Sequence, residues 1–427
     1  MDAFILSAPL SEIPFTLLLS AAKPSKEVGS VHSVREARGP GRPVPTIIKA
    51  SAMSRPLSSS LVNSLAQQAG FALAAVAPIP ESESETTREE RARFDRWIAR
   101  GSAGEMEYLK RRNESGELVR STLHAVFPWV KSVIVCAATY NTNQPRSIDP
   151  APQGSGWISR YAWSENRTAQ PPRPSDYHNV LLKRLKSLET ELRQHTGDFE
   201  SRCYVDTGPL VERVYARYAG IGWTGKNCTI LNQRLGSLFF LAVILTSLEP
   251  ESSIPQLTAD RCGSCTRCID ACPTLALTPY QMDATRCISY LTIEKRGSVP
   301  EDLRSGMGRN IFGCDICQDV CPWNAKSLRE SPPAEDPELA PREAFVNPAL
   351  DWLASLTRED FAQWFYGSPI KRARYEGLRR NIAIAMGNSG LAEYLPQLEE
   401  WSRDEDDGLR EAASWAIQQL SMQAAER

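Results

Sequence analysis

The stretch CGSCTRCIDACP, residues 262–273, decides how the central part of this 427-residue chain must fold. Its cysteines follow the spacing C-x2-C-x2-C-x3-C-P, and a short loop of this kind turns three thiolates towards one centre while the fourth points elsewhere. A second run, CDICQDVCP at 314–322, repeats the last three of these cysteine positions, and Cys287 is the candidate for the missing first one. The segment 251–330 is therefore predicted to be a small domain built around its cysteines.

This spacing is typical of bacterial ferredoxins with two [4Fe-4S] clusters, in which the fourth cysteine of each run ligates the other cluster. That rule assigns the eight cysteines to two sets, with Cys262, Cys265, Cys268 and Cys321 in one and Cys272, Cys287, Cys314 and Cys317 in the other. Four thiolates also suit zinc, so a pair of zinc sites is the alternative, although zinc sites rarely use this run. The clusters alone predict electron transfer and not yet a reaction.

Composition indicates a globular protein of two or three domains. Hydrophobic residues make up 42%, charged residues 23%, and the formal net charge is −2. No apolar run reaches the ~18 residues of a membrane helix, and a charge near zero gives no general attraction to nucleic acid. We expect a cytoplasmic monomer without a membrane partner. Residues 1–52, rich in Pro, Gly, Ser and Arg, are interpreted as a disordered extension or as the product of a start codon upstream of Met53.

Predicted strands and helices alternate between residues 53 and 250, which is typical of an α/β domain. The runs 131–140 and 237–248 predict buried strands because they are apolar and rich in β-branched residues. Apolar residues recur at helical spacing between Asp176 and Gly197, which predicts a helix that ends at the glycine.

The segment Asn141–Pro174 is rich in Pro, Gly, Ser and Asn and is expected to be a loop or insertion. The chain from 331 to 427 is predicted to be helical. Similar patterns that begin at Leu378 and Leu409 indicate a small helical cap of HEAT type.

The order of short motifs resembles that of one family, the epoxyqueuosine reductases, from about Ser58 to Leu420. The matching motifs are GEMEYL (104–109), SVIV (132–135), DYH (176–178), VDTGPLVER (205–213), GIGWTGKN (220–227), GSLFFLAVILT (236–246), both cysteine runs, FYGSPIKR (365–372) and LRRNIAIAMGNSG (378–390). The chain departs from the family pattern in the extra residues 1–52, in the length of Asn141–Pro174, and at Val243, where the family often has an acidic residue.

The resemblance implies a cobalamin- and iron–sulfur-dependent enzyme that acts on tRNA. The implied reaction reduces the epoxide of the modified wobble base to an alkene, the last step of queuosine synthesis. A low-potential Co(I) corrin would supply the electrons and would be refilled through the two clusters from an external low-potential donor. The implied fold is an α/β corrin-binding domain at 53–250, a ferredoxin-like two-cluster domain at 251–330 and an α-helical, HEAT-like tRNA-binding cap at 331–427.

The resemblance also implies roles for individual residues. Asp206 matches the family's proposed proton donor, and the alternative is that it caps the helix that follows. Lys226 and Asn227 resemble corrin contacts, although Gly-rich turns are common in proteins. Cys136 resembles a residue that lines the corrin face, and the alternative is a small buried hydrophobe. His178 is interpreted as a capping or surface residue and not as a cobalt ligand.

Five basic residues fall within ten positions of the expected cap, namely Lys371, Arg372, Arg374, Arg379 and Arg380. Basic side chains of this kind contact phosphates and position a nucleic acid, so this run is the predicted tRNA contact. The alternative is a solvated helix face that is balanced by the acidic residues at 404–407.

Two other functions stay open. Reductive dehalogenases resemble the family's corrin and two-cluster core, but they usually carry a twin-arginine export signal, which is not visible here. An electron carrier of the ferredoxin type would need no large domain ahead of its clusters.

Overall fold

The structure, a computed structural model, describes residues 56–427 apart from 81–83, 122, 331–334 and 426–427. The extension predicted at 1–52 lies outside the described residues. Met53–Arg427 is one compact unit. None of the helices in the described part combines the length and the apolar character that spanning a bilayer requires.

The α-helices are α1 (Ser59–Gln68), α2 (Glu85–Ala99), α3 (Leu123–Val126), α4 (Tyr177–Thr196), α5 (Glu212–Tyr218), α6 (Arg267–Asp270), α7 (Ile288–Ile293), α8 (Glu301–Arg304), α9 (Ile316–Asp319), α10 (Pro322–Glu330), α11 (Leu350–Ser355), α12 (Arg358–Trp364), α13 (Arg374–Ser389), α14 (Leu395–Trp401) and α15 (Asp407–Ala425). Short 3-10 helices are η2 (Glu107–Leu109), η3 (Val119–Ser121), η4 (Arg160–Ala162), η5 (Ala284–Arg286), η6 (Glu343–Phe345), η7 (Pro369–Ala373) and η8 (Ala392–Tyr394).

The strands are β1 (Leu73–Pro78), β2 (Ser132–Thr139), β3 (Trp157–Ile158), β4 (Ser164–Asn166), β5 (Arg173–Pro174), β6 (Ser201–Tyr204), β7 (Trp223–Thr224), β8 (Ile230–Leu231), β9 (Phe239–Thr246), β10 (Leu277–Thr278), β11 (Gln281–Met282), β12 (Asn310–Phe312) and β13 (Ala340–Pro341).

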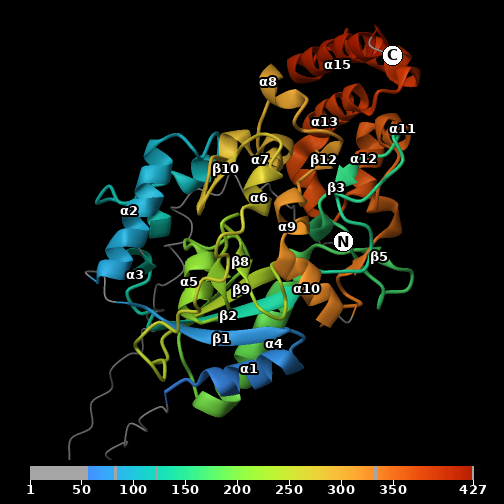
Figure 1. Cartoon of the computed structure of the whole chain (residues 1–427). Coiled ribbons are helices and arrows are strands. Elements are labelled where there is room, and N and C mark those ends of the chain that lie inside the picture. Colours follow the sequence, from blue (N-terminus) through green and yellow to red (C-terminus); the bar gives the residue numbers. More distant parts are fainter. Residues whose placement is uncertain (1–55, 81–83, 122, 331–334, 426–427) are drawn as a thin grey trace, which may run out of the picture. The chain divides into compact units, whose positions relative to one another are not determined.

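The main sheet has the order β1-β2-β9-β6, and every neighbouring pair in it is antiparallel. Helices α1 and α4 lie on one side of this sheet and α5 on the other (Figure 1). The alternation of strands and helices favoured an α/β domain, whose sheet is usually parallel, so the direction of the strands differs from that expectation. The runs in β2 and β9 are apolar throughout because both faces of the sheet are buried, which in other folds is the mark of a parallel sheet.

A second core joins the region of the cysteines to the C-terminal helices. It contains side chains from β3, α7, β12, α11, α13 and α15. Because one core serves all of these elements, it crosses the boundary expected at residue 331. Helices α13 and α15 carry the two similar patterns and pack closely, since a Cβ on Gly387 would lie 2.8 Å from the Cα of Ala416. Their description as a HEAT-type cap stays a prediction.

The segment Asn141–Pro174 is not simply a loop, which corrects the sequence-based expectation. Trp157 and Trp163 are buried in the second core, and β3 pairs in parallel with β12, more than a hundred residues further along the chain. Strands β4 and β5 form a three-stranded sheet with β13. Strands of two or three residues with distant partners leave no periodic pattern in a sequence rich in Pro and Gly.

Arg380 fastens α13 to the region of the cysteines. Its guanidinium donates hydrogen bonds to the carbonyl oxygens of Leu291, Lys295 and Gly297 at 2.7–2.9 Å, and only 2% of the residue is exposed. The neighbouring Asn381 is fully buried and donates to the carbonyl oxygens of α7 and β12. Arg380 therefore cannot contact a tRNA phosphate, which corrects that part of the prediction from the basic run.

We predict that Arg380→Met lowers the free energy of unfolding by about 3 kcal/mol, because a side chain of similar length leaves one buried and two partly buried carbonyl oxygens without their donor. Lys371→Gln is the control, since the lysine is exposed and its replacement should change stability by less than about 0.5 kcal/mol. Denaturant unfolding of both variants measures the difference. An Arg380→Met protein as stable as the control would contradict the structural role.

Candidate iron–sulfur and proton-transfer site

The seven cysteines of the two runs, and Cys287 between them, lie in short loops and in or next to short helices. Cys268 and Cys317 lie within α6 and α9, which pack together, and each of these helices is followed by a Cys-Pro pair. Cys287 lies at the start of α7 and Cys314 just after β12. All eight are free cysteines.

The thiols form two groups of neighbours. Burial and three nearby thiols raise the pKa of Cys268 to about 11; these neighbours are Cys321, Cys262 and Cys265. Burial and a different set of neighbours raise the pKa of Cys314, and Cys317 and Cys287 belong to that set. Burial also raises the pKa of Cys287, with a further contribution from Cys272. Cys317 is influenced by Cys287 and Cys272 of its expected set and also by Cys268 of the other, so the thiols lie near one another while the division into two sets stays a prediction.

This donor set fits cluster ligation. Thiolates held close together repel one another, and a cationic iron centre removes that repulsion. The backbone N–H of Ala276 donates to the Sγ of Cys272 at 3.3 Å, a contact typical of protein-bound iron–sulfur clusters. Within the described residues, no three His, Cys, Asp or Glu side chains are gathered around a single-ion site. The assignment of each cysteine to its cluster stays a prediction.

The turn that holds Lys226 and Asn227 forms hydrogen bonds to both cysteine runs. The ammonium of Lys226 donates to the carbonyl oxygens of Gly263 and Cys265 at 2.7 and 3.0 Å. The amide of Asn227 donates to the carbonyl oxygen of Cys317 at 3.3 Å. Both side chains therefore support the loops that carry the cysteines, a role the sequence did not suggest. A corrin contact at this turn stays a prediction.

Cys136 lies within β2, opposite Ala74 and Ala242, and is completely buried under α1 and α4. The structure favours the packing role that the sequence left open for this cysteine.

Asp206 is exposed on the loop between β6 and α5. Its φ of 57° is left-handed, a conformation that aspartate tolerates better than most residues. Gly208 permits the tight turn because a Cβ there would collide with Leu210 and Tyr204. The helix that follows is capped by Val211 without a side-chain hydrogen bond. Asp206 is therefore not the helix cap that was the alternative interpretation.

The start of α4 brings two aromatic side chains to Asp206. The hydroxyl of Tyr177 donates to Oδ2 of Asp206 at 2.5 Å, and Nε2 of His178 lies 4.0 Å from the same oxygen. Burial and the charge of Asp206 raise the pKa of Tyr177 well above its usual value, so the phenol stays protonated. The other ring nitrogen of His178 lies 2.7 Å from Oδ1 of Asp176, which also caps α4. Sequence reasoning missed this arrangement, although the DYH motif marked it.

Aromatic side chains lead from Asp206 to the second thiol group. The Tyr161 ring contacts the rings of Tyr177 and Phe312, with centroids 6.1 and 6.0 Å apart. Phe312 ends β12, two residues before Cys314. The proton-bearing cluster of side chains thus lies beside one predicted iron centre, with a mainly apolar layer between them.

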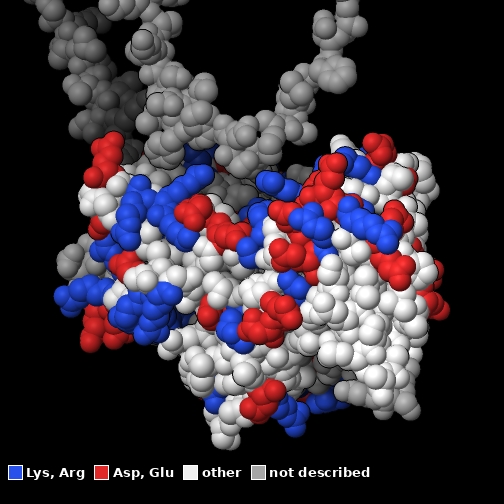
Figure 2. All heavy atoms as spheres, turned by 90° about the horizontal axis from the view of Figure 1, so that it is seen from above, with Lys and Arg blue, Asp and Glu red and all other residues white. Residues whose placement is uncertain are grey.

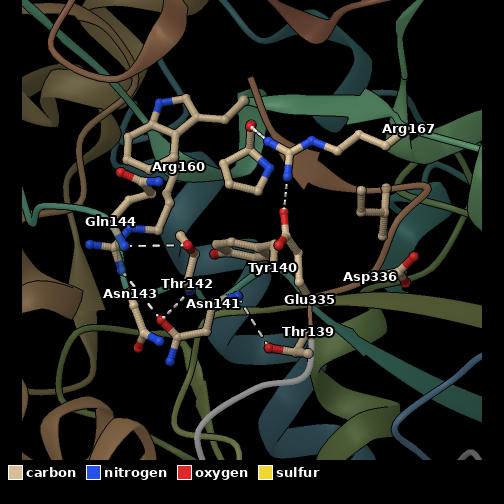
Figure 3. Close-up of a pocket in the computed structure, with 13 residues that line it drawn as sticks. Thr139, Tyr140, Asn141, Thr142, Asn143, Gln144, Arg160, Arg167, Glu335 and Asp336 are labelled. Carbon is tan, nitrogen blue, oxygen red and sulfur yellow. Dashed lines mark hydrogen bonds and ion pairs between the residues drawn. The ribbon is translucent and has the colours of Figure 1, made fainter. Parts of the chain in front are cut away.

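A polar cavity of about 280 Å³ lies at the end of β2, lined in part by Asn141, Arg160, Arg167 and Glu335 (Figure 3). Arg167 pairs with Glu335 on one side of the cavity, and Arg160 pairs with the buried Asp319. The Nε of Arg160 and the Nδ2 of Asn141 are buried donors without a hydrogen-bond partner among the described residues. The cavity is therefore suited to a ligand group that offers an oxygen acceptor.

The predicted tRNA contacts differ in their exposure and in whether they already form an ion pair. Lys371, Arg372 and Arg374 are exposed. Arg372 nevertheless pairs with Glu294 at 2.5 Å, and Arg379 pairs with Asp404 at 3.0 Å with only 19% of its side chain exposed. The alternative interpretation, a run balanced by the acids at 404–407, therefore holds for Arg379.

Two family models match the chain. One is described as a 4Fe-4S double cluster binding domain and matches residues 261–324, which contain the seven cysteines of the two runs and Cys287. The other is described as epoxyqueuosine reductase QueG, DUF1730, and matches residues 120–207.

Curated relatives and solved structures carry the same name. The epoxyqueuosine reductase of Synechocystis sp. is 38% identical over 308 residues, which are 72% of this chain and 97% of the relative. The enzyme of Escherichia coli (strain K12) is 35% identical over 376 residues, which are 86% of this chain and 92% of the relative. A crystal structure of epoxyqueuosine reductase with an epoxyqueuosine-modified tRNA-Tyr stem loop superimposes with a TM-score of 0.70 at 29% identity, covering 84% of this chain and 89% of that chain. The Bacillus subtilis enzyme, solved with its catalytic aspartate loop swung out of the active site, gives a TM-score of 0.69 at 28% identity, covering 84% of this chain and 90% of that chain.

The double-cluster domain and the proton-bearing side chains beside it define an iron–sulfur oxidoreductase. At this level of identity over nearly the whole of the relatives, the particular family is clear. The chain belongs to the epoxyqueuosine reductases.

We predict that Cys287→Ser lowers the iron content from about eight to about four atoms per chain, because it removes one ligand of the group that contains Cys314. Iron analysis and electron paramagnetic resonance of the anaerobically purified, reduced protein measure what remains. Cys203→Ser is the control, since this cysteine lies outside both groups and should leave both clusters in place. If the variant lost the resonance signals of both clusters, or kept both, Cys287 would not be a ligand of one cluster alone.

Proposed function

We propose that this protein reduces epoxyqueuosine at the wobble position of tRNA to queuosine, with electrons that pass through its two [4Fe-4S] clusters to a bound cobalamin. The observation that carries the proposal is the position of Asp206, exposed to a substrate on one side and hydrogen-bonded to Tyr177 on the other, next to the second thiol group. The names of the relatives favour this function over another corrinoid reductase or an electron carrier.

The support for cobalamin comes from the family resemblance and from the chemistry of the cavity in Figure 3. The cavity is too small for a corrin ring, but its unpartnered donors on Asn141 and Arg160 fit the carbonyl oxygen of one corrin amide arm. When bound, the corrin would supply a low-potential cobalt that passes electrons to the substrate. Lys226 and Asn227 remain the other candidates for its contacts.

Asp206 is proposed to give a proton to the oxygen that leaves the substrate. About half of its side chain is exposed (53%), so a bound nucleoside can reach it. Tyr177 holds Oδ2 by its hydrogen bond and thereby orients the carboxyl group. Asp176 orients His178, whose second nitrogen faces Asp206 and connects it to solvent. Carboxyl groups placed in this way act as general acids.

The proposed tRNA contact is now limited to the exposed side chains at the start of α13. Within the described residues, Lys371 and Arg374 form no ion pair, and Lys371 lies over the ring of Tyr366, which is 71% exposed. An exposed aromatic ring beside a cation is a platform on which a base can stack. The face in Figure 2 shows basic and acidic side chains interspersed, so tRNA binding would depend on a few contacts and not on a large basic surface.

An external low-potential electron donor, a monomeric state and a cytoplasmic location remain predictions. The same holds for the three domain ranges 53–250, 251–330 and 331–427.

We predict that Asp206→Asn keeps iron content and thermal stability but lowers the rate of epoxyqueuosine reduction by about 10²–10⁴-fold, because an amide cannot donate the proton. The rate is measured on a modified tRNA stem loop with excess reductant. Asp198→Asn is the control, since its carboxylate is fully exposed near the end of α4 and should not matter. A fast Asp206→Asn enzyme would refute the role of Asp206 as donor.

We further predict that a variant with Lys371→Gln and Arg374→Gln binds the tRNA stem loop more weakly and with a log–log salt slope smaller by roughly 1.5, because each lost phosphate contact removes about 0.7–0.9. The matched control replaces Lys131 and Lys183, two exposed lysines of the sheet domain, by glutamine. Fluorescence anisotropy at several salt concentrations gives both slopes. Equal slopes for the two double variants would place the tRNA contact elsewhere.

A further inference from the structure

One buried N–H group beside the cysteines has no acceptor. Trp223 begins β7, three residues before Lys226, and is only 2% exposed. Its Nε1 is buried and has no hydrogen-bond partner among the described residues. Burying such a donor is costly as long as nothing accepts its hydrogen bond. An acceptor that arrives with a bound cofactor would remove this cost.

Two cysteines and several apolar groups surround the Trp223 ring. Trp223, Leu231 and Cys321 form a small buried cluster, and Cys262 and Trp323 pack against it. The rings of Trp223 and Trp323 meet edge to face, with their centroids 5.1 Å apart. A water molecule inside a protein needs two or more polar partners, and the only acceptors among these side chains are sulfur atoms. The acceptor that the indole N–H lacks is therefore expected to be sulfur.

The Trp223 side chain also influences the charge on one of these cysteines. Burial raises the pKa of Cys262, whereas the Lys226 backbone and the Trp223 side chain act in the opposite direction. A donor with this effect stabilises negative charge on the sulfur. Cys262 and Cys321 belong to the same expected cluster set, so the indole lies beside two ligands of one predicted cluster.

This predicted cluster is within reach of an external electron donor. Gly263, Ser264 and Thr266, which lie between its first three cysteines, are exposed. Reduction of a [4Fe-4S] cluster adds one electron, and part of the added negative charge resides on the sulfur atoms. A hydrogen bond to one of these sulfurs therefore favours the reduced form and raises the reduction potential.

We infer that Trp223 tunes the reduction potential of the cluster expected on Cys262, Cys265, Cys268 and Cys321, by donating its indole N–H to a sulfur atom of that cluster. The inference rests on the part of the proposed function in which electrons pass through the clusters. In the step that Trp223 favours, an external low-potential donor is oxidised by one electron and one ferric ion of the cluster becomes ferrous. No bond breaks, and the indole keeps its proton.

The first test compares Trp223→Phe with Trp323→Phe. Both variants keep an aromatic ring beside the cysteines, but the N–H of Trp323 donates to the carbonyl oxygen of Arg261 at 3.4 Å and not to sulfur. Redox titrations of the anaerobically purified protein, followed by electron paramagnetic resonance, give the potentials of both clusters. We expect Trp223→Phe to lower one potential so that, at a fixed applied potential, the ratio of reduced to oxidised cluster falls about tenfold, or about 59 mV for one electron. Trp323→Phe should change both potentials much less.

A second measurement needs no variant that might fail to take up iron. Wild-type protein is labelled with tryptophan that carries ¹⁵N only in the indole ring, and the reduced clusters are studied by pulsed electron paramagnetic resonance. A hydrogen bond from indole to a cluster sulfur should give a ¹⁵N hyperfine coupling. This coupling should persist in Trp323→Phe and disappear in Trp223→Phe.

The outcomes separate this inference from the proposed function. If labelled wild-type protein with about eight irons per chain showed no indole coupling, or if Trp223→Phe with the same iron content kept both wild-type potentials, the inference would be wrong. A wild-type protein that shows the coupling but does not reduce epoxyqueuosine would refute the proposed function and leave the role of Trp223 in place.

Discussion

The buried carboxylate of Asp315 is the interaction on which the arrangement of the site depends. It lies between two cysteines of the second run and accepts hydrogen bonds from the Trp157 ring at 3.2 Å, the Ser159 hydroxyl at 2.5 Å and the Arg160 backbone at 2.8 Å. Burial, with a further contribution from Asp319, raises its pKa above the usual range of a carboxyl group. These bonds fix the segment that carries Tyr161 to the loop that carries the thiols. Together with the pairing of β3 and β12, they set the position of the aromatic contacts between Asp206 and the cysteine loop.

The chemistry of the site follows from two environments that meet at these aromatic rings. On one side, thiols are packed closely enough to influence one another, as Cys268 and its three neighbours are. On the other side, carboxyl, phenol and imidazole groups gather around an exposed loop. In the proposed reaction, the thiol side would supply the electrons and the carboxyl side the protons. A mainly apolar layer between them limits direct protonation of the reduced centre.

The sequence predicted those features that depend on spacing or on local pattern. The ferredoxin spacing predicted a double-cluster domain, which the family model at 261–324 confirms, and α4 ends at Gly197 as its apolar periodicity indicated. It could not predict features that depend on remote partners. The strands β3 and β12 pair across a long separation, and the apolar runs of β2 and β9 do not indicate whether these strands pair in parallel or antiparallel. Likewise, the run of basic residues gave no sign that Arg380 is buried and donates to carbonyl oxygens while Lys371, nine positions earlier, is exposed.

The parallel pairing of β3 with β12 has a consequence for how the protein is made. Trp157 and Ile158 join their core only after Asn310–Phe312 have left the ribosome. Roughly 150 residues separate the two strands, and at ~5–20 residues per second their synthesis takes about 8–30 s. During that time the indole rings of Trp157 and Trp163, which contact each other, lack the side chains that β12 and the later helices add to the second core. Nascent chains should thus require chaperone protection until the last cysteine has been translated, so that acquisition of iron and closure of the core become one late event in biogenesis.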